Sequence, residues 1–157
     1  RSIANFILDV ASEKDIQVTN LALNKIAYFL HGIYLAKKGE PLIDAKIEAW
    51  QYGPVFREIY HEFKAFDRGP IKGRAQRIDL ETGKKIDCEY HFSRDDIDFL
   101  YDAVSPYLRM NTGKLVELSH IYDGPWHKAW HHEERVNPGM EITNEAIADY
   151  FSQQVRH

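Results

Sequence analysis

The segment from Thr19 to Gly39 reads TNLALNKIAYFLHGIYLAKKG, and its pattern sets the architecture that we expect. Thr19 is a suitable N-cap, because its hydroxyl can accept a hydrogen bond from a backbone N–H of the first helical turn. Gly39 is a typical stop, since glycine readily adopts the left-handed conformation that ends many helices. Apolar side chains between these two residues occupy nearly every face. We therefore predict a long helix over 20–38 that is buried at the centre of the protein.

Shorter elements are expected around this helix. Helical spacing of apolar residues predicts further helices over 3–12, 54–66, 94–106, 112–118, 125–130 and 144–151. Residues 46–52 alternate weakly, as in a strand, and residues 75–92 alternate more strictly about a turn at 81–84, as in a β-hairpin. The sequence thus predicts an α+β fold: a mainly helical single domain over residues 1–157 with a small antiparallel β-sheet or hairpin.

Two motifs each join a tryptophan to a Gly-Pro pair. The first covers 49–55 and reads AWQYGPV; the second covers 119–126 and reads SHIYDGPW. Gly-Pro interrupts regular structure, and proline is well tolerated in the first turn of a helix. We interpret each motif as a short extended segment or turn that ends at the glycine and restarts as a helix at the proline.

The motifs support a structural and a functional interpretation. In the structural one, Trp50 and the Gly-Pro-Val run at 53–55 fix a corner and fill the core, and Tyr60 joins them on a helical face. In the functional one, Trp50 and Tyr52 flank a surface that contacts a partner. His120 is expected to contact the turn at 123–125. The candidate motif or partner-binding residues are Trp50, Tyr52, Gly53, Pro54, Val55, Tyr60, His120, Pro125 and Trp126.

A group of histidines raises an enzymatic alternative. His127 and His131 lie four residues apart and would share one face of a helix, a spacing that suits a metal ion. Glu133 and Glu134 could add oxygen ligands. The zinc-protease signature places a glutamate directly after the first histidine, but Lys128 stands there. We expect a solvated polar helix face without metal or cofactor, and keep a small metal-dependent enzyme as the competing class.

The composition narrows the classes of protein. A chain of 157 residues with 44% hydrophobic residues can bury the core of one globular domain. A net charge of −4 argues against non-specific nucleic-acid binding. Cys88 is a single cysteine, which permits no internal disulfide. No apolar run is long enough to cross a bilayer and no signal peptide is visible, so we expect a cytoplasmic protein without a membrane partner.

The order of the motifs resembles that of a known family. The run LALNKIAYFL at 21–30 leads to GEPL at 39–42, EAW at 48–50, GPV at 53–55, Tyr60 and finally the corner at 119–126. This ordered set resembles the Panacea antitoxin domain of SocA-like and phage-associated GepA-like proteins, and the resemblance extends over nearly the whole chain.

The resemblance implies an antitoxin of a bacterial or prophage toxin–antitoxin system. Such a protein is not an enzyme and neutralises a cognate toxin by direct protein contact. The SocA member implies an alternative, a proteolytic adaptor that delivers the toxin to a ClpXP-type protease. Two features depart from the motif set: the hairpin within 71–92 is longer, and no helix-turn-helix domain is appended. We expect the hairpin to help select the partner, and no operator binding.

Overall fold

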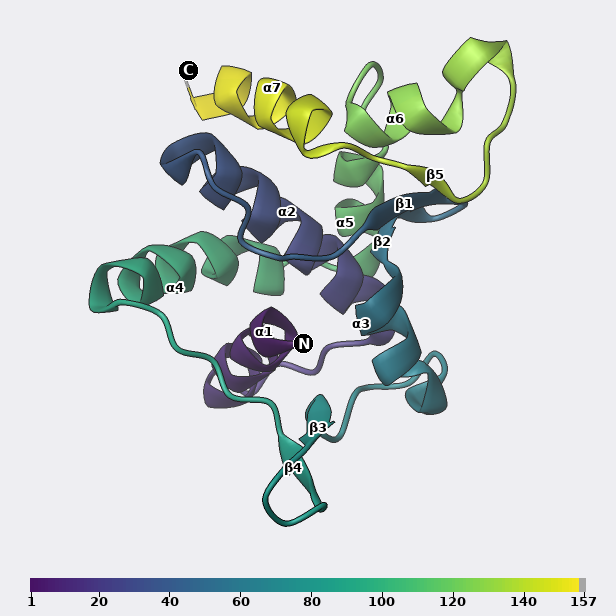
Figure 1. Cartoon of the computed structure of the whole chain (residues 1–157). Helices are drawn as coiled ribbons and strands as arrows, with labels where there is room; N and C mark the ends of the chain where they lie inside the picture. Colours follow the sequence, from purple (N-terminus) through teal and green to yellow (C-terminus); the bar gives the residue numbers. More distant parts are fainter. Residues whose placement is uncertain (156–157) are drawn as a thin grey trace.

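The central helix forms as the sequence predicts. The computed structural model describes residues 1–155, and in it α2 spans Asn20–Lys38. The Thr19 hydroxyl accepts a hydrogen bond from the Ala22 N–H, and Gly39 ends the helix with a left-handed φ of 73°. Figure 1 shows α2 in the middle of the molecule, with α7 on one side and α1 and α4 on the other. Its apolar side chains are therefore covered in several directions, as expected for a helix apolar nearly all round.

The remaining helices confirm most of the predicted ranges. They are α1 (Ser2–Glu13), α3 (Arg57–Glu62), α4 (Arg94–Leu108), α5 (Thr112–Ser119), α6 (Pro125–Trp130) and α7 (Asn144–Val155), with short 3₁₀ turns η1 (Lys64–Phe66) and η2 (His132–Glu134). Side chains of Ser93 and Asn111 cap α4 and α5, and Thr143 accepts from the Ala146 N–H at the start of α7. Pro106 lies inside α4, which ends two residues later.

A three-stranded antiparallel sheet corrects one prediction. Its strands β1 (Ile47–Trp50), β2 (Gly53–Phe56) and β5 (Met140–Glu141) lie in the order β2–β1–β5. Pro54 therefore lies in a strand, opposite Ala49, and the expected helix begins only at Arg57. Proline is tolerated there because β2 is an edge strand, whose outer side needs no ladder N–H. The two-residue strand β5 is too short to give an alternation signal.

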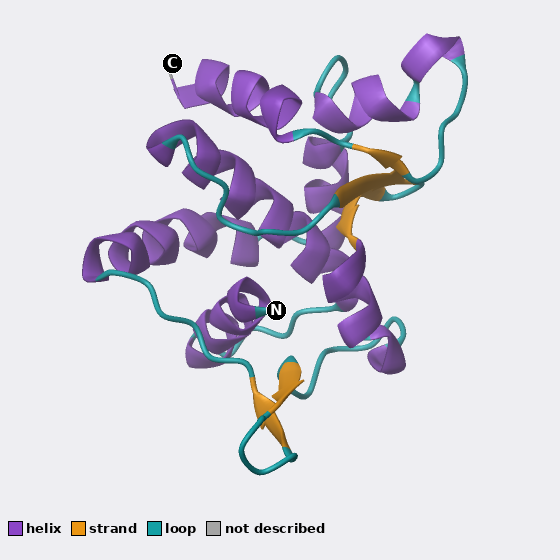
Figure 2. Ribbon diagram, viewed as in Figure 1, coloured by secondary structure: helices purple, strands orange, loops and turns teal. Residues whose placement is uncertain are grey.

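The predicted hairpin forms but is shorter than expected. Strands β3 (Gln76–Ile78) and β4 (Lys85–Asp87) pair antiparallel and extend away from the helices (Figure 2). Asn5, which is buried in α1, holds the base of the hairpin: its amide donates to the carbonyls of Ala75 and Cys88 and accepts from the Ala75 N–H. The tip has no such support, and Leu80 is 96% exposed.

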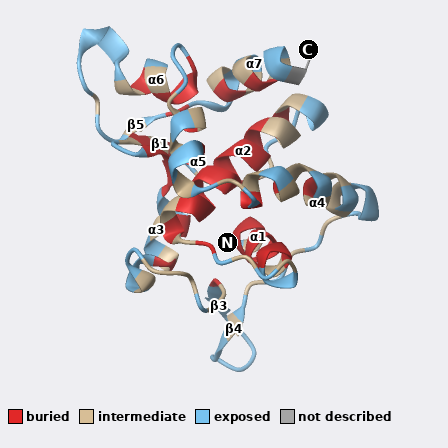
Figure 3. Ribbon diagram, turned by 180° about the vertical axis from the view of Figure 1, so that it is seen from behind, coloured by how far each residue is buried: buried red, intermediate tan, exposed pale blue. Residues whose placement is uncertain are grey.

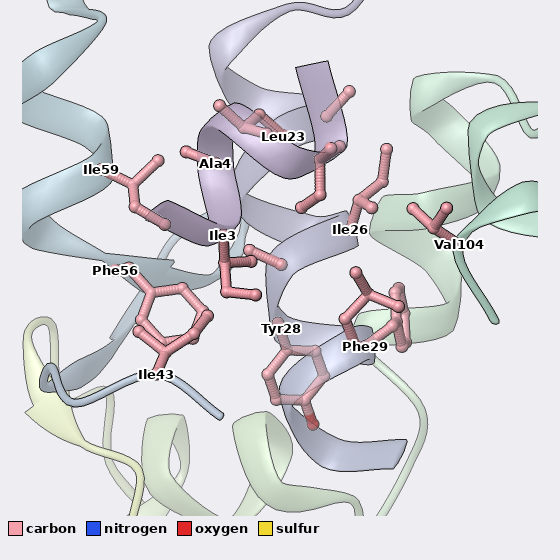
Figure 4. Close-up of a cluster of buried hydrophobic side chains, with 14 of the residues drawn as sticks. Ile3, Ala4, Leu23, Ile26, Tyr28, Phe29, Ile43, Phe56, Ile59 and Val104 are labelled. Atoms are coloured by element: carbon pink, nitrogen blue, oxygen red, sulfur yellow. The ribbon is translucent and has the colours of Figure 1, made fainter. Parts of the chain in front are cut away.

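One cluster of buried apolar side chains joins the helices to the sheet. Figure 4 shows side chains of α1, α2, α3, α4 and β2 gathered in it, and Figure 3 shows the buried residues concentrated along α1 and α2. Gly32 lets α7 approach α2, because a side chain there would meet the Phe151 ring. The buried His31 connects α2 to its surroundings, since Nδ1 accepts from the Ile43 N–H and Nε2 donates to Asn144 Oδ1. The mainly helical α+β fold is confirmed, and within residues 1–155 no helix combines the length and apolarity needed to cross a bilayer.

Candidate functional site

The first tryptophan motif forms the tight turn between β1 and β2. Trp50 pairs with Gly53, so Gln51 and Tyr52 form the turn itself, and Tyr52 is 60% exposed. Gly53 has a φ of 116°, a conformation that side-chain-bearing residues rarely adopt. A Cβ at this position would also lie 2.6 Å from both Lys25 Cε and Ser119 Oγ. Both the backbone conformation and the packing therefore require glycine at this corner.

Buried polar side chains of α2 hold β2 in place. Lys25 is fully buried, and its Nζ donates to the Pro54 carbonyl over 2.9 Å. Asn24 accepts from the Phe56 N–H through Oδ1, and its amide donates to Asn20. Asn20 in turn donates to the Tyr60 carbonyl at the end of α3. These bonds fix the strand and the following helix against the central helix, because breaking any of them would leave a buried polar group without a partner.

The environment of Lys25 disfavours its charge. Burial lowers the pKa of the Lys25 ammonium to about 7. No carboxylate of the described chain forms an ion pair with this amine, and its hydrogen-bond acceptor is a neutral carbonyl. The pKa is lowered because a buried ammonium without an anionic partner is poorly solvated.

A cleft of about 820 Å³ lies beside β2, the strand that these buried side chains hold. We call it the aromatic cleft, and its walls include Trp50, Tyr52, Val55 and Tyr60 together with the charged residues Lys64, Asp67 and Arg68. The Trp50 and Tyr60 rings lie edge to face with centroids 4.8 Å apart, and the Trp50 indole N–H donates to Glu48 Oε1. Tyr60 is therefore half-buried at the wall of a cleft, whereas the sequence placed it in the core. A concave site with aromatic walls and a few polar groups is the form that binding sites usually take.

The second motif lies directly behind the first. Trp126 is 5% exposed, and its indole N–H donates to the Trp50 carbonyl over 2.8 Å. Pro125 is buried at the first position of α6, as the sequence predicts. The Trp126 ring packs against His120 and Trp130, with centroid distances of 3.8 and 5.4 Å. Two motifs some seventy residues apart in the chain thus form one corner, in which Trp126 is interior and Trp50 reaches the cleft.

His120 has different partners from those expected. Its Nδ1 lies 2.6 Å from the Val116 carbonyl and its Nε2 lies 3.2 Å from the Gln51 carbonyl, so it joins the end of α5 to the β1–β2 turn. The expected contact with the turn at 123–125 is instead made by His127, whose Nδ1 accepts from the Asp123 N–H. The sequence misassigned this contact because the fold brings the Gln51 turn, distant in sequence, against the end of α5.

Ser119 Oγ and His120 Nδ1 lie 3.2 Å apart, but each atom has another partner at the end of α5. His120 Nδ1 also lies 2.6 Å from the Val116 carbonyl. The Ser119 hydroxyl itself donates to the Val116 carbonyl over 2.8 Å and is buried. Both groups are occupied in fixing the end of α5.

His127 in α6 and His131, directly after its end, do not line the aromatic cleft. The His127 and His131 rings are 4.6 Å apart, and His131 is exposed. Glu133 makes an ion pair with Arg135 in the following turn. Within the described part of the chain, no group of three or more His, Cys, Asp and Glu side chains is arranged to hold a metal ion.

Two groups of residues at or behind the cleft were not identified from the sequence. Asn24 and Lys25 gave a usable signal, since they are polar residues within a helix that is otherwise apolar nearly all round. Lys64 and Arg68 gave none, because their position depends on the turn after η1, where Asp67 has a positive φ of 54°.

Comparisons with known proteins identify a family whose matched region contains both tryptophan motifs. Residues 23–127 match the family described as Antitoxin SocA-like, Panacea domain. The chain belongs to this family of SocA-like Panacea-domain antitoxins.

A curated relative in the same family is Antitoxin SocA of Caulobacter vibrioides (strain NA1000 / CB15N). It is 34% identical to this chain over 152 residues, which are 96% of this chain and 81% of the relative. No solved structure gives a significant match.

Proposed function

We propose that this protein is an antitoxin that neutralises a cognate toxin by direct protein–protein contact, and that the aromatic cleft is the contact surface. The observation that carries the proposal is the exposure of Tyr52 on a turn whose backbone is fixed from behind. Lys25 and Asn24 bond to β2, and Trp126 bonds to β1, the two strands that flank this turn. An exposed aromatic residue on a rigid support binds with little loss of conformational entropy, which favours affinity.

The residues of the cleft are those that commonly dominate protein interfaces. Trp50, Tyr52 and Tyr60 supply aromatic surface, and Arg68 supplies a planar cation. Tryptophan, tyrosine and arginine are enriched among residues whose truncation costs most binding energy. Because the chain belongs to an antitoxin family, we infer that this surface binds a toxin.

The proposed mechanism is non-enzymatic. Lys25 is fully buried and donates to the Pro54 carbonyl, and Ser119 is engaged in a helix end. Binding alone would suffice, because a protein seated on a toxin's active site or substrate path blocks it. Stoichiometric zinc or iron in protein purified without an affinity tag, with turnover that is lost on chelation, would contradict this mechanism.

The function is tested with the product of the gene beside this one in the genome. Cells that express this neighbouring protein alone should stop growing, and co-expression of the antitoxin should restore growth. The two proteins should co-purify, and the toxin should keep its steady-state level in cells with and without a ClpXP-type protease. If the toxin is lost only when the protease is present, the antitoxin delivers the toxin for proteolysis and does not act by blocking it. Continued growth arrest with both proteins present would contradict the antitoxin function.

A further inference from the structure

The aromatic cleft differs in charge from the protein as a whole. Lys64, Asp67 and Arg68 are its charged lining residues, so two cations and one anion leave it positive, whereas the whole chain carries −4. None of these three residues forms an ion pair within the described chain. Other charged side chains of the described chain do, such as Arg57 with Glu48 and Arg1 with Glu62. The cations of the cleft are thus free to pair with a partner.

The aromatic turn and the cations come from different elements that line the same cleft. Trp50 and Tyr52 come from the β1–β2 turn, and Lys64 and Arg68 come from η1 and the turn after it. Thr19, Asn20 and Leu21 also line the cleft, so that the positive end of the α2 dipole adds to its potential. The cleft therefore offers both apolar contact and positive charge to one ligand.

On the basis of the proposed antitoxin function, we propose that the cleft binds a segment of the toxin in which an aromatic or long apolar side chain stands beside a carboxylate. The apolar side chain packs between Trp50 and Tyr52, and the carboxylate pairs with Lys64 or Arg68. Such pairing gives an interface specificity and a faster association rate, because unlike charges steer the two proteins together. A volume of about 820 Å³ is ample for two or three side chains.

A protein segment fits the charges better than a nucleic acid does. A phosphodiester backbone would bring a regular row of negative charges past Asp67, which lies between the two cations in the sequence. The net charge of −4 would oppose it further. A peptide presents one or two carboxylates at defined positions, and its backbone N–H groups can donate to Asp67.

The test compares two double charge reversals in the full-length antitoxin. Lys64→Glu with Arg68→Glu reverses the cleft, and Lys84→Glu with Lys85→Glu makes the same change of charge on the hairpin. All four side chains are exposed, so both variants should melt like the wild type. Titration calorimetry with the neighbouring gene's product should show a loss of at least ~30-fold in affinity for the cleft variant and less than ~5-fold for the hairpin variant. If the cleft variant unfolds, Lys64→Gln with Arg68→Gln replaces it.

A zero-length carbodiimide cross-linker gives an independent measurement, because it joins an amine to a carboxylate only when the two are in contact. Mass spectrometry should find Lys64 linked to an Asp or Glu of the toxin. Unchanged affinity of the cleft variant, or displacement of the toxin from the wild type by a short single-stranded oligonucleotide, would overturn this inference while leaving the antitoxin function standing. If the wild type binds no toxin at all, both proposals fall.

Discussion

The aromatic cleft and the β3–β4 hairpin are both attached to the core by a buried asparagine, but they are supported to very different extents. Asn24 bonds β2 immediately beside the cleft, and Lys25 and Trp126 add further bonds to the strands on either side of the Tyr52 turn. Asn5 bonds only the base of the hairpin, at Ala75 and Cys88. The strands on both sides of Tyr52 are therefore fixed to the core, whereas the hydrogen bonds around Leu80 come from its own turn.

This difference suggests a division of roles. A preorganised aromatic surface can supply affinity, because little conformational freedom is lost on binding. An exposed loop on a fixed base can vary without disturbing the core, and so can modulate which partner is accepted. We expect changes behind the cleft to affect folding, changes in the cleft to affect binding, and changes in the hairpin to affect both only weakly.

The largest effect is expected at the corner behind the cleft. Trp126→Ala should lower the free energy of unfolding by about 3–5 kcal/mol, because it removes a buried ring and the hydrogen bond to the Trp50 carbonyl. Leu80→Ala at the hairpin tip is the matched control and should stay within about 0.5 kcal/mol. Urea unfolding of the purified variants measures both. A Trp126→Ala protein as stable as the wild type would show that the corner is not part of the scaffold.

Two glycines sharpen the comparison, since both have positive φ but only one is enclosed. Gly53→Ala should cost about 2–4 kcal/mol, because backbone strain combines with the clash against Lys25 and Ser119. Gly83→Ala, in the hairpin turn with open space around it, should cost only the strain, about 1–2 kcal/mol. Thermal and chemical denaturation of the two variants measure both losses of stability. Equal losses would mean that the packing around Gly53 contributes nothing.

The pH dependence of stability should reveal Lys25. Its folded pKa of about 7 lies below the ordinary 10.5, so the unfolded chain binds more protons between these values and stability rises with pH there. The Lys25 contribution should increase by about 2–3 kcal/mol from pH 7 to 9.5. Above pH 10 the trend should reverse, because Tyr28 and Tyr90 have raised pKa values and the unfolded state then loses protons first.

Lys25→Met is the control for this slope. The variant should lose the rise between pH 7 and 9.5 while keeping the fall above pH 10. Urea unfolding at half-unit pH steps provides the measurement, and an identical slope in the variant and the wild type would assign the titration to another group.

The smallest effect is expected from charges on the hairpin strands. Arg77→Glu with Lys85→Glu should change the affinity for the toxin by about two- to fivefold, since exposed rim charges mainly affect the association rate. Asp79 is unsuitable for this test, because its carboxylate accepts from the Glu81 N–H and the Thr82 hydroxyl and so organises the turn. Stopped-flow association at low and high salt distinguishes steering from a direct contact. A loss as large as that from the cleft would move the main recognition surface to the hairpin.

Local signals account for what the sequence predicted correctly. The cap at Thr19 and the stop at Gly39 lie at the ends of the helix they define, and the turn at 81–84 lies inside its own hairpin. Pro54 was assigned to a helix because its neighbours have helical spacing. A bond from Lys25, 29 residues away, to Pro54 and one from Asn24, 32 residues away, to Phe56 hold this segment as a strand instead. Contacts of this kind leave no trace in a local pattern.

The candidate site was recovered in part for the same reason. Trp50 and Tyr52 stood out as aromatic residues beside a Gly-Pro break, and the structure places both on one cleft. Lys64 and Arg68 join them only because η1 and the turn after it line the same cleft, and His120 reaches Gln51 only because α5 ends beside the turn. The chemistry of the motif could be read from the sequence, but the residues gathered around it depend on the fold.

The most direct test of the division between cleft and hairpin is the affinity of Tyr52→Ala for the toxin. Tyr52 is 60% exposed, so its truncation should leave the melting temperature nearly unchanged. Titration calorimetry with the neighbouring gene's product should show a loss of about 30-fold, or about 2 kcal/mol, as expected for an aromatic residue at the centre of an interface. Wild-type affinity in a folded Tyr52→Ala protein would contradict the assignment of the aromatic cleft as the surface that binds the toxin.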